Sequence, residues 1–145
     1  MYYSLFSIIY YLLSKEAFYT QEKVFKVAQD SVLLEKSLRF VARIVKLHRY
    51  LTKEKHEGII SKQIIRSATS IGANANEAIY GSSTQDFLAK LHIPLKETVE
   101  TEYWLRLLQL SDYLTEKEAN SLLSDCLEIK RILIASINTA KANMK

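Results

Sequence analysis

Apolar and small residues recur at steps of three and four along most of this chain, and that spacing constrains the fold more than any other feature. The segment IISKQIIRSATSIGANANEA at residues 59–78 has three isoleucines and three alanines at the repeating positions, with the small residues Ser67, Ser70 and Gly72 beside them. A step of three to four residues places these side chains on one face of a helix. Small side chains on that face let a second helix approach closely, so the segment predicts packing between helices.

Three further stretches have the same spacing, and few residues interrupt them. The 145 residues include three glycines and one proline, too few for a fold rich in strands and turns. This length suits one domain with a sizeable core. We therefore predict an all-α protein. Its four inward-facing stripes are Leu34, Leu38, Val41, Val45, His48 and Leu51; Ile60, Ile64, Ala68, Ile71, Ala75 and Ala78; Leu88, Leu91, Leu95, Thr98 or Val99, and Leu105; and Ala119, Leu122, Cys126, Ile129, Leu133, Ile137 and Ala140.

Capping and turn residues divide residues 30–145 into four helices. Short polar side chains before an apolar stripe can accept hydrogen bonds from the first amides of a helix. These signals are Asp30 or Ser31 for the first helix, Gly58 for the first turn, Ser82 with Gln85 or else Ser83 for the third helix, and Thr115 with Glu118 for the last. Short connections between long helices predict an antiparallel up-down-up-down four-helix bundle.

Pro94 lies deep in the third helical pattern. Proline lacks the amide that would bond the carbonyl of Lys90, which costs about 3 kcal/mol relative to a good helix former. The apolar spacing resumes on both sides. We therefore expect one helix with a kink between residues 90 and 94.

Residues 1–29 form a separate N-terminal extension, rich in aromatic side chains. Seven aromatic residues fall within the first 20 positions. The uncharged run before Lys15 is shorter than the about 20 residues that cross a bilayer, and it lacks the features of a signal peptide. A segment docked on the bundle, an interfacial anchor and translated upstream sequence remain as alternatives, and we favour a docked or dispensable segment. The lone Cys126 fits a reducing cytoplasm, as a packed core thiol.

The first helix carries most of the candidate binding residues. Six cations face away from part of its apolar stripe, and only two carboxylates oppose them between residues 30 and 53. The cations are Lys36, Arg39, Arg43, Lys46, Arg49 and Lys53. Such a face can follow phosphates, because lysine and arginine release condensed counterions from nucleic acid. The alternative is a solvated face that pairs with acidic residues. The net charge of +4 permits either interpretation.

The conspicuous residues of the second and third helices favour a structural interpretation. Glu77, Glu97, Glu100 and Glu102 could face one another, but no histidine follows a glutamate by three residues, as di-iron bundles require. We therefore predict no metal or other cofactor. Antiparallel packing instead places Arg66 level with Glu97 or Glu100, as an ion pair that fixes helix register.

The remaining motifs also predict packing contacts. Gly72 would permit close helix contact and Asn74 would add a hydrogen bond that specifies it, whereas a phosphate loop needs further glycines and a lysine. Tyr103 and Trp104 are predicted to be core or subunit contacts, rather than a platform for bases. No spacing of serine, histidine and aspartate suggests a nucleophile, so we predict that the protein is not an enzyme.

Several of these motifs together resemble a known family. The matching residues are Arg66-Ser67, Thr69-Ser70-Ile71-Gly72, Asn74, Glu77-Ala78, Asp86-Phe87, Lys90-Leu91, Lys96-Glu97, Glu100 to Leu105, and Glu35 to Leu47. The chain resembles, over roughly residues 30–140, the bacterial four-helix bundle proteins encoded in intervening sequences of 23S ribosomal RNA. It is also similar to the accessory protein of diversity-generating retroelements. The resemblance implies a ring-like homopentamer with nucleic-acid binding and no catalytic residues. Pro94 and the N-terminal extension depart from the family pattern.

Two functions follow as hypotheses. The first is a non-enzymatic, oligomeric bundle that binds structured RNA, or DNA, through basic helix faces with low sequence specificity. The second is a protein-interaction scaffold that docks a reverse transcriptase or a ribosomal component, with the charges serving solubility. A membrane-surface protein anchored by residues 1–20 is a weaker third hypothesis.

Overall fold

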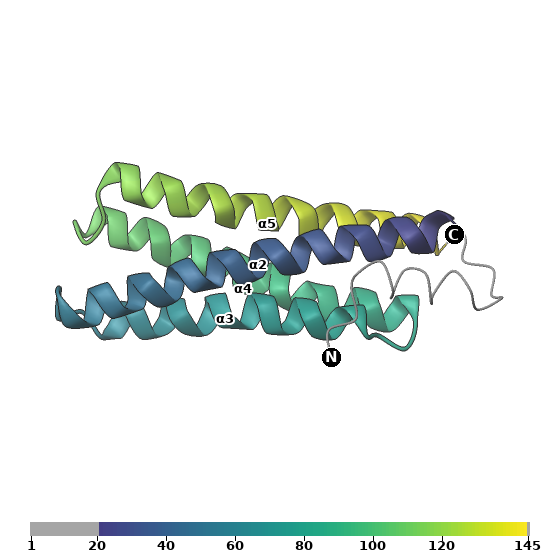
Figure 1. The fold of residues 1–145 in the computed structure, drawn as a ribbon, viewed down its shortest axis with the longest axis horizontal. Coiled ribbons are helices and arrows are strands. Elements are labelled where there is room, and N and C mark those ends of the chain that lie inside the picture. Colours follow the sequence, from purple (N-terminus) through teal and green to yellow (C-terminus); the bar gives the residue numbers. More distant parts are fainter. Residues whose placement is uncertain (1–20, 145) are drawn as a thin grey trace, which may run out of the picture.

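Four helices pack around one apolar core in the computed structural model, which describes the backbone of residues 21–144 and the side chains of residues 32–144. The helices are α2 (Gln21–Lys53), α3 (Ile59–Ile79), α4 (Thr84–Leu110) and α5 (Glu116–Ala142). No strand occurs within residues 21–144. Figure 1 shows the α2–α3 and α4–α5 turns at one end of the molecule and the α3–α4 turn at the other. The predicted all-α class is confirmed.

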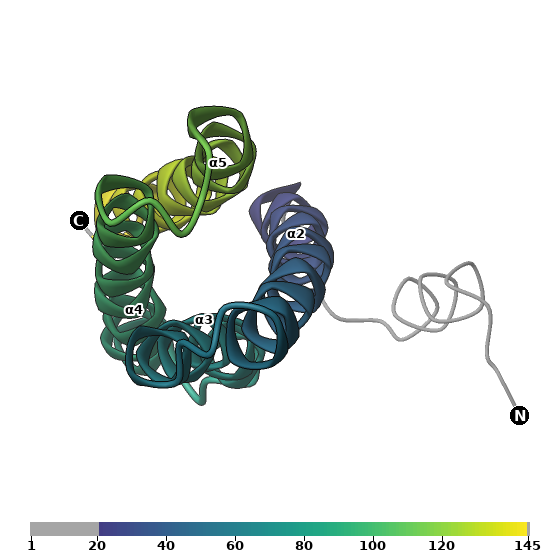
Figure 2. The same cartoon turned by 90° about the vertical axis from the view of Figure 1, so that its left-hand side faces the viewer.

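The four helices follow one another around the core in chain order (Figure 2). Each contacts the next, and α5 also contacts α2. Among the residues that the structure describes, the contact between α2 and α5 is the sparsest of the four, whereas α3 and α4 contact each other most extensively. The seam between α2 and α5 is therefore the most loosely packed one in this part of the chain.

The inward face of α2 is shifted by one position from most of the predicted stripe. Leu33, Phe40 and Ile44 are at most 1% exposed, whereas the predicted Leu38 is 74% exposed. The predicted Leu51 is fully buried. The predicted Leu34, Val41, Val45 and His48 are only partly buried. One position is about 100° of rotation on a helix, so α2 is turned relative to the prediction.

The first helix also begins earlier than its capping signals predict. It runs through residues 30 and 31 from Gln21, so Asp30 and Ser31 do not cap its start. The predicted division into residues 1–29 and 30–145 stays a prediction, because residues 1–20 lie outside the described part of the chain.

The predicted stripes of the other three helices are buried almost throughout. In α3 the buried positions include Ile64, Ala68, Ile71, Ala75 and Ala78. In α4, Thr98 is buried and Val99 is 49% exposed, which decides between those two alternatives. All seven residues predicted for the last stripe are buried in α5.

A carboxylate caps α3. The side chain of the buried Glu57 accepts hydrogen bonds from the backbone amides of residues 59, 60 and 61, at 2.8–2.9 Å. Negative charge at this position is favourable, because the first amides of a helix lack partners and its N-terminus is partly positive. The predicted turn at Gly58 is present, with His56 in the left-handed region at φ 54°.

Ser83 and Thr115 cap the last two helices. Ser83 accepts from the amide of Asp86, so the second of the two predicted caps is correct. Thr115 and Glu118 form the predicted capping box, in which each side chain bonds the other's backbone amide. These hydrogen bonds with Thr115 lower the pKa of the Glu118 carboxyl.

α4 continues through Pro94, as predicted, from Thr84 to Leu110. Pro94 is buried, and its carbonyl accepts a 2.7 Å hydrogen bond from the hydroxyl of Thr98. The predicted kink between residues 90 and 94 stays a prediction.

Candidate nucleic-acid interface

The six predicted cations of α2 fall into two groups. Lys36, Arg39 and Arg43 each pair with a carboxylate. Lys46, Arg49 and Lys53 are exposed, and no carboxylate within the described side chains pairs with them. The structure therefore separates residues that the sequence pattern presents as one face.

Two of the paired cations bridge the loosely packed seam to α5. The Nζ of Lys36 lies 2.9 Å from a carboxyl oxygen of Glu128. Arg43 pairs with Asp125, and its guanidinium also donates to the hydroxyl of Ser121 at 2.8 Å. These ion pairs join the two helices whose contact is the sparsest. Part of the predicted binding face is therefore a structural contact between α2 and α5.

Arg39 forms a weaker pair on the outside of α2. Its guanidinium lies 2.9 Å from the carboxylate of Glu35 one turn earlier, with the two side chains 78% and 64% exposed. Water screens such a pair, which contributes at most about 0.5 kcal/mol. A polyanion could displace Glu35 at little cost. Arg39 is therefore more available to a ligand than Lys36 and Arg43, and less available than the unpaired cations.

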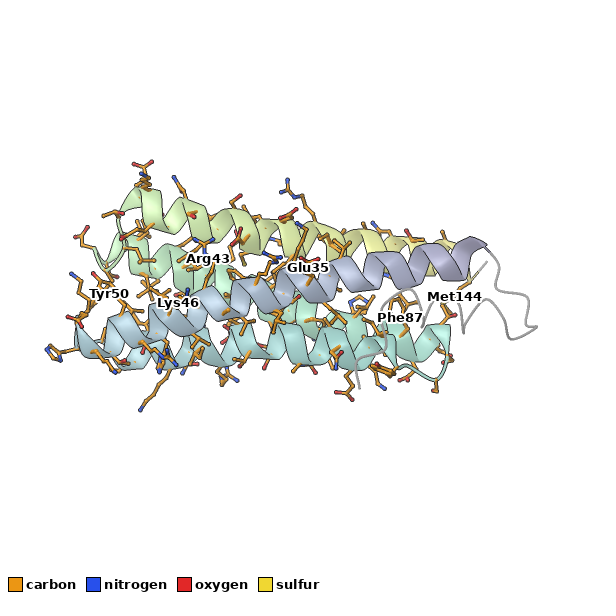
Figure 3. The ribbon with its side chains drawn as sticks, in the orientation of Figure 1. Glu35, Arg43, Lys46, Tyr50, Phe87 and Met144 are labelled. Carbon is orange, nitrogen blue, oxygen red and sulfur yellow. The ribbon has the colours of Figure 1, made fainter. Side chains whose placement is uncertain are left out.

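Lys46, Arg49 and Lys53 form what we call the outer basic face. Steps of three and four residues place them on one side of α2, over about 10 Å of helix axis. That length matches about three phosphates along one strand of a duplex, at about 3.4 Å each. Figure 3 shows Lys46 on the part of α2 that approaches the α2–α3 turn, with Arg43 further from that turn. Three cations without partners thus lie together near one end of the bundle.

The predicted register contacts join α3 and α4. Arg66 pairs with Glu100 at 3.0 Å, and the Ser67 and Thr101 hydroxyls are joined by a 2.8 Å hydrogen bond. Both contacts connect residues 34 positions apart, which fixes one alignment of the two helices. Of the two predicted partners of Arg66, Glu100 is correct. The Arg66 side chain is 63% exposed, so this contact specifies register more than it stabilises.

Glu97 lies beside this pair without entering it. One of its carboxyl oxygens is buried and has no hydrogen-bond partner. Burial raises the pKa of the Glu97 carboxyl, the nearby Glu100 raises it further, and Arg66 partly offsets the shift. Within the described side chains, no group of three or more histidine, cysteine, aspartate or glutamate residues is arranged to hold a metal ion.

Gly72 and Asn74 do less for helix packing than predicted. A Cβ added to Gly72 would lie 3.8 Å from the Cβ of Ser37 on α2, an ordinary contact distance that does not require glycine. The Asn74 amide donates to the Ser70 carbonyl of its own helix at 2.8 Å, so it specifies no contact between helices. Glu77 is exposed on α3.

Tyr103 and Trp104 have different environments although they are adjacent. Their rings meet edge to face with centroids 5.0 Å apart. Trp104 packs against the core and donates from Nε1 to Glu100 at 3.1 Å. Tyr103 is 60% exposed. Of the two predicted roles, Trp104 has the core one, whereas for exposed Tyr103 the role of a subunit contact stays a prediction.

Cys126 is the predicted core thiol. It is fully buried, and burial raises its pKa to about 12. Its Sγ lies 3.5 Å from the carbonyl of Thr98. Because the thiolate is the reactive form, this side chain is inert at neutral pH.

A charged network joins α4 and α5, and the sequence predicts only part of it. Glu102 accepts from Lys130 at 2.8 Å and from Arg106 at 2.9 Å. These hydrogen bonds, with that from Lys130 the stronger influence, lower the pKa of the Glu102 carboxyl although burial opposes the shift. The spacing of Glu102 and Arg106 predicts their contact, but no local signal reveals the contact with Lys130 on another helix.

These features define a class: a four-helix protein whose charged groups join helices or lie on the surface. The family model described as 23S rRNA-intervening sequence protein matches residues 29–135, and the chain belongs to this family. It is also similar to a crystal structure of a protein of unknown function from the S23 ribosomal protein family of Bacteroides thetaiotaomicron. The two share 48% sequence identity with a TM-score of 0.74, over 76% of this chain and 98% of that one. No protein with a curated description matches the chain.

Proposed function

We propose that this protein is a non-enzymatic, oligomeric helical bundle that binds structured RNA through the outer basic face. The observation that carries the proposal is the exposure of Lys46, Arg49 and Lys53 on one side of α2, without a carboxylate partner in the described part of the chain. Unpaired cations retain their full attraction for phosphate and lose no internal contact when they bind. The family description, which names 23S rRNA, supports RNA as the first ligand to test.

Low sequence specificity follows from the same geometry. Lysine and arginine side chains on a helix surface reach phosphates, which are the same in every sequence. An A-form major groove is also too narrow for side chains to read its bases. We therefore expect structured RNA and DNA to bind with affinities that depend mainly on charge density and salt.

An assembly with several copies of this face would strengthen the interaction. On α4, Val99, Tyr103 and Leu110 are 49%, 60% and 83% exposed, and their spacing places them on one side of the helix. An exposed apolar stripe of this kind supports self-association in an up-down-up-down bundle, with a homopentamer as the assembly to test first. Several weak sites on one particle bind a long polyanion with increased avidity.

The alternative function is a scaffold for a protein partner without direct nucleic-acid binding. The same α4 stripe favours it, since exposed apolar side chains suit a protein surface better than a phosphate backbone.

No helix in the described part of the chain has the length and apolar character needed to cross a membrane. We propose a cytoplasmic location and no membrane role.

The test is binding of a fluorescent structured RNA at increasing salt, with light scattering of the same samples. Three phosphate contacts per protomer predict about a 40-fold loss of affinity between about 50 and 200 mM salt. Changing Lys46, Arg49 and Lys53 to Gln should weaken binding and reduce the slope of log affinity against log salt by about three.

The matched control removes the same charge elsewhere. Lys96, Arg131 and Lys141 are also exposed, and they lie on α4 and α5 away from the α2–α3 turn. Their replacement by Gln should leave most of the affinity and slope. Equal losses in the two triple variants would contradict the assigned face, and absence of RNA binding by the unchanged protein would favour the scaffold.

A further inference from the structure

Tyr50 is an exposed aromatic side chain within the outer basic face. It follows Lys46 by four residues and precedes Lys53 by three, so each lies about one helical turn away. The residue is 39% exposed, and the Nζ of Lys55 lies 5.7 Å from the centroid of its ring. Figure 3 shows Tyr50 at the same end of α2 as Lys46. An aromatic ring and several cations are therefore available side by side.

No hydrogen bond within the described residues accounts for the ring of Tyr50. It is not among the aromatic residues that pack on the core, such as Trp104 and Tyr113. Its hydroxyl has no hydrogen-bond partner within the described residues, and its backbone carbonyl bonds the amides of Glu54 and Lys55 whichever side chain it carries. Leucine in its place therefore removes no hydrogen bond, and it keeps an apolar side chain for the covered part of this 39% exposed residue.

We propose that Tyr50 stacks on an unpaired base of the RNA whose phosphates contact Lys46, Arg49 and Lys53. This inference rests on the proposed function and deepens it, because it selects single-stranded stretches and loops over continuous duplex. In a duplex both faces of each base are covered by neighbouring bases, so an aromatic side chain finds no surface to stack on. Unpaired bases are free to leave their neighbours and stack on an aromatic ring.

Lys55 fits this arrangement. Its side chain is exposed and flexible, and the attraction between an exposed ammonium and a tyrosine ring is modest. A base could replace the ammonium over the ring while Lys55 turns to a neighbouring phosphate. Since every base has an aromatic face, stacking would favour unpaired nucleotides without selecting a sequence.

The experiment compares three fluorescent ligands of equal length: oligouridylate, its duplex with oligoadenylate, and an abasic oligomer that keeps the phosphates. Tyr50→Leu should weaken binding of oligouridylate by about 5- to 150-fold, the range for one stacked base. Its affinity for the duplex and the abasic oligomer should stay within about twofold of the unchanged protein. Tyr50→Phe keeps the ring and should bind all three ligands normally.

Tyr80→Leu is the matched control. Tyr80 is 79% exposed and lies at the α3–α4 turn, at the opposite end of the bundle from the α2–α3 turn (Figure 1). The Tyr80→Leu variant should bind all three ligands like the unchanged protein. Equal affinities of Tyr50→Leu and the unchanged protein for oligouridylate would overturn the stacking role, as would an equal loss for oligouridylate and the abasic oligomer. Those results leave RNA binding by the outer basic face intact, whereas failure of the unchanged protein to bind any ligand rejects both proposals.

Discussion

Two parts of α2, residues 36–43 and residues 46–53, carry three of the candidate cations each and use them differently. In the first part, Lys36 and Arg43 cross the seam to carboxylates of α5, and Arg39 pairs within its own helix. In the second part, Lys46 and Arg49 remain exposed without such partners. The difference lies in the neighbouring helix, because Asp125 and Glu128 of α5 lie beside the first part. A count of charges along one helix therefore cannot reveal which of them can bind a ligand.

The strongest test of this comparison removes the paired cations. Replacing Lys36, Arg39 and Arg43 by Gln should lower the free energy of unfolding by about 2 kcal/mol, since partly exposed pairs contribute up to about 1 kcal/mol each and Arg43 also loses its bonds to Ser121. RNA affinity should fall much less than in the triple variant of the outer basic face. Urea unfolding and RNA titration measure the two effects. A variant with normal stability and no RNA binding would reverse the roles assigned to residues 36–43 and 46–53.

A second test carries the contrast between paired and unpaired charge to α4. Glu102 is paired and its pKa is lowered, so its contribution to stability is present above its unfolded pKa and is lost as pH falls through the folded value. Glu97 is unpaired and its pKa is raised, so the native state favours its protonated form and loses stability as pH rises through the folded value. The two carboxylates should therefore respond to pH in opposite directions.

At neutral pH, Glu102→Gln should destabilise the protein by about 1.5 kcal/mol, the size of a hydrogen bond to a charged group. Glu97→Gln should stabilise it by about 0.5 kcal/mol, a size typical of partly exposed sites. Both differences should shrink at acidic pH, where the original carboxyls are protonated. Thermal unfolding at several pH values measures this, and a pH-independent difference in either variant would contradict the assigned cause.

The sequence predicts the parts of this molecule that depend on local spacing. The buried stripe of α5 and the Thr115 capping box follow from residues within one segment, and the structure contains both. In α2 two adjacent apolar stripes compete: the predicted stripe includes Leu38, and the buried one includes Ile44. Packing against α3 and α5 decides between them, so local spacing alone could not.

Contacts between helices were predictable only where register followed from a short turn. The pairing of Arg66 with Glu100 could be predicted by counting outward from the turn between α3 and α4. The pairing of Arg43 with Asp125 joins residues 82 positions apart, across a seam that no single turn aligns. For that reason the sequence could identify the cations of α2 without separating those that bridge helices from those that remain available.

The smallest expected effect concerns Glu54, an exposed carboxylate four residues after Tyr50. Its amide bonds the carbonyl of Tyr50, so the helical spacing continues and brings the carboxylate near the outer basic face. A negative charge there repels phosphate, and Glu54→Gln should raise RNA affinity by about twofold at low salt and by less at high salt, because screening removes the repulsion. Glu77, exposed on α3 beside the α3–α4 turn at the other end of the bundle, offers the matched Glu→Gln control, which should change affinity little. An equal gain in both variants would mean that net charge, and not the part of α2 beside the ligand, governs binding.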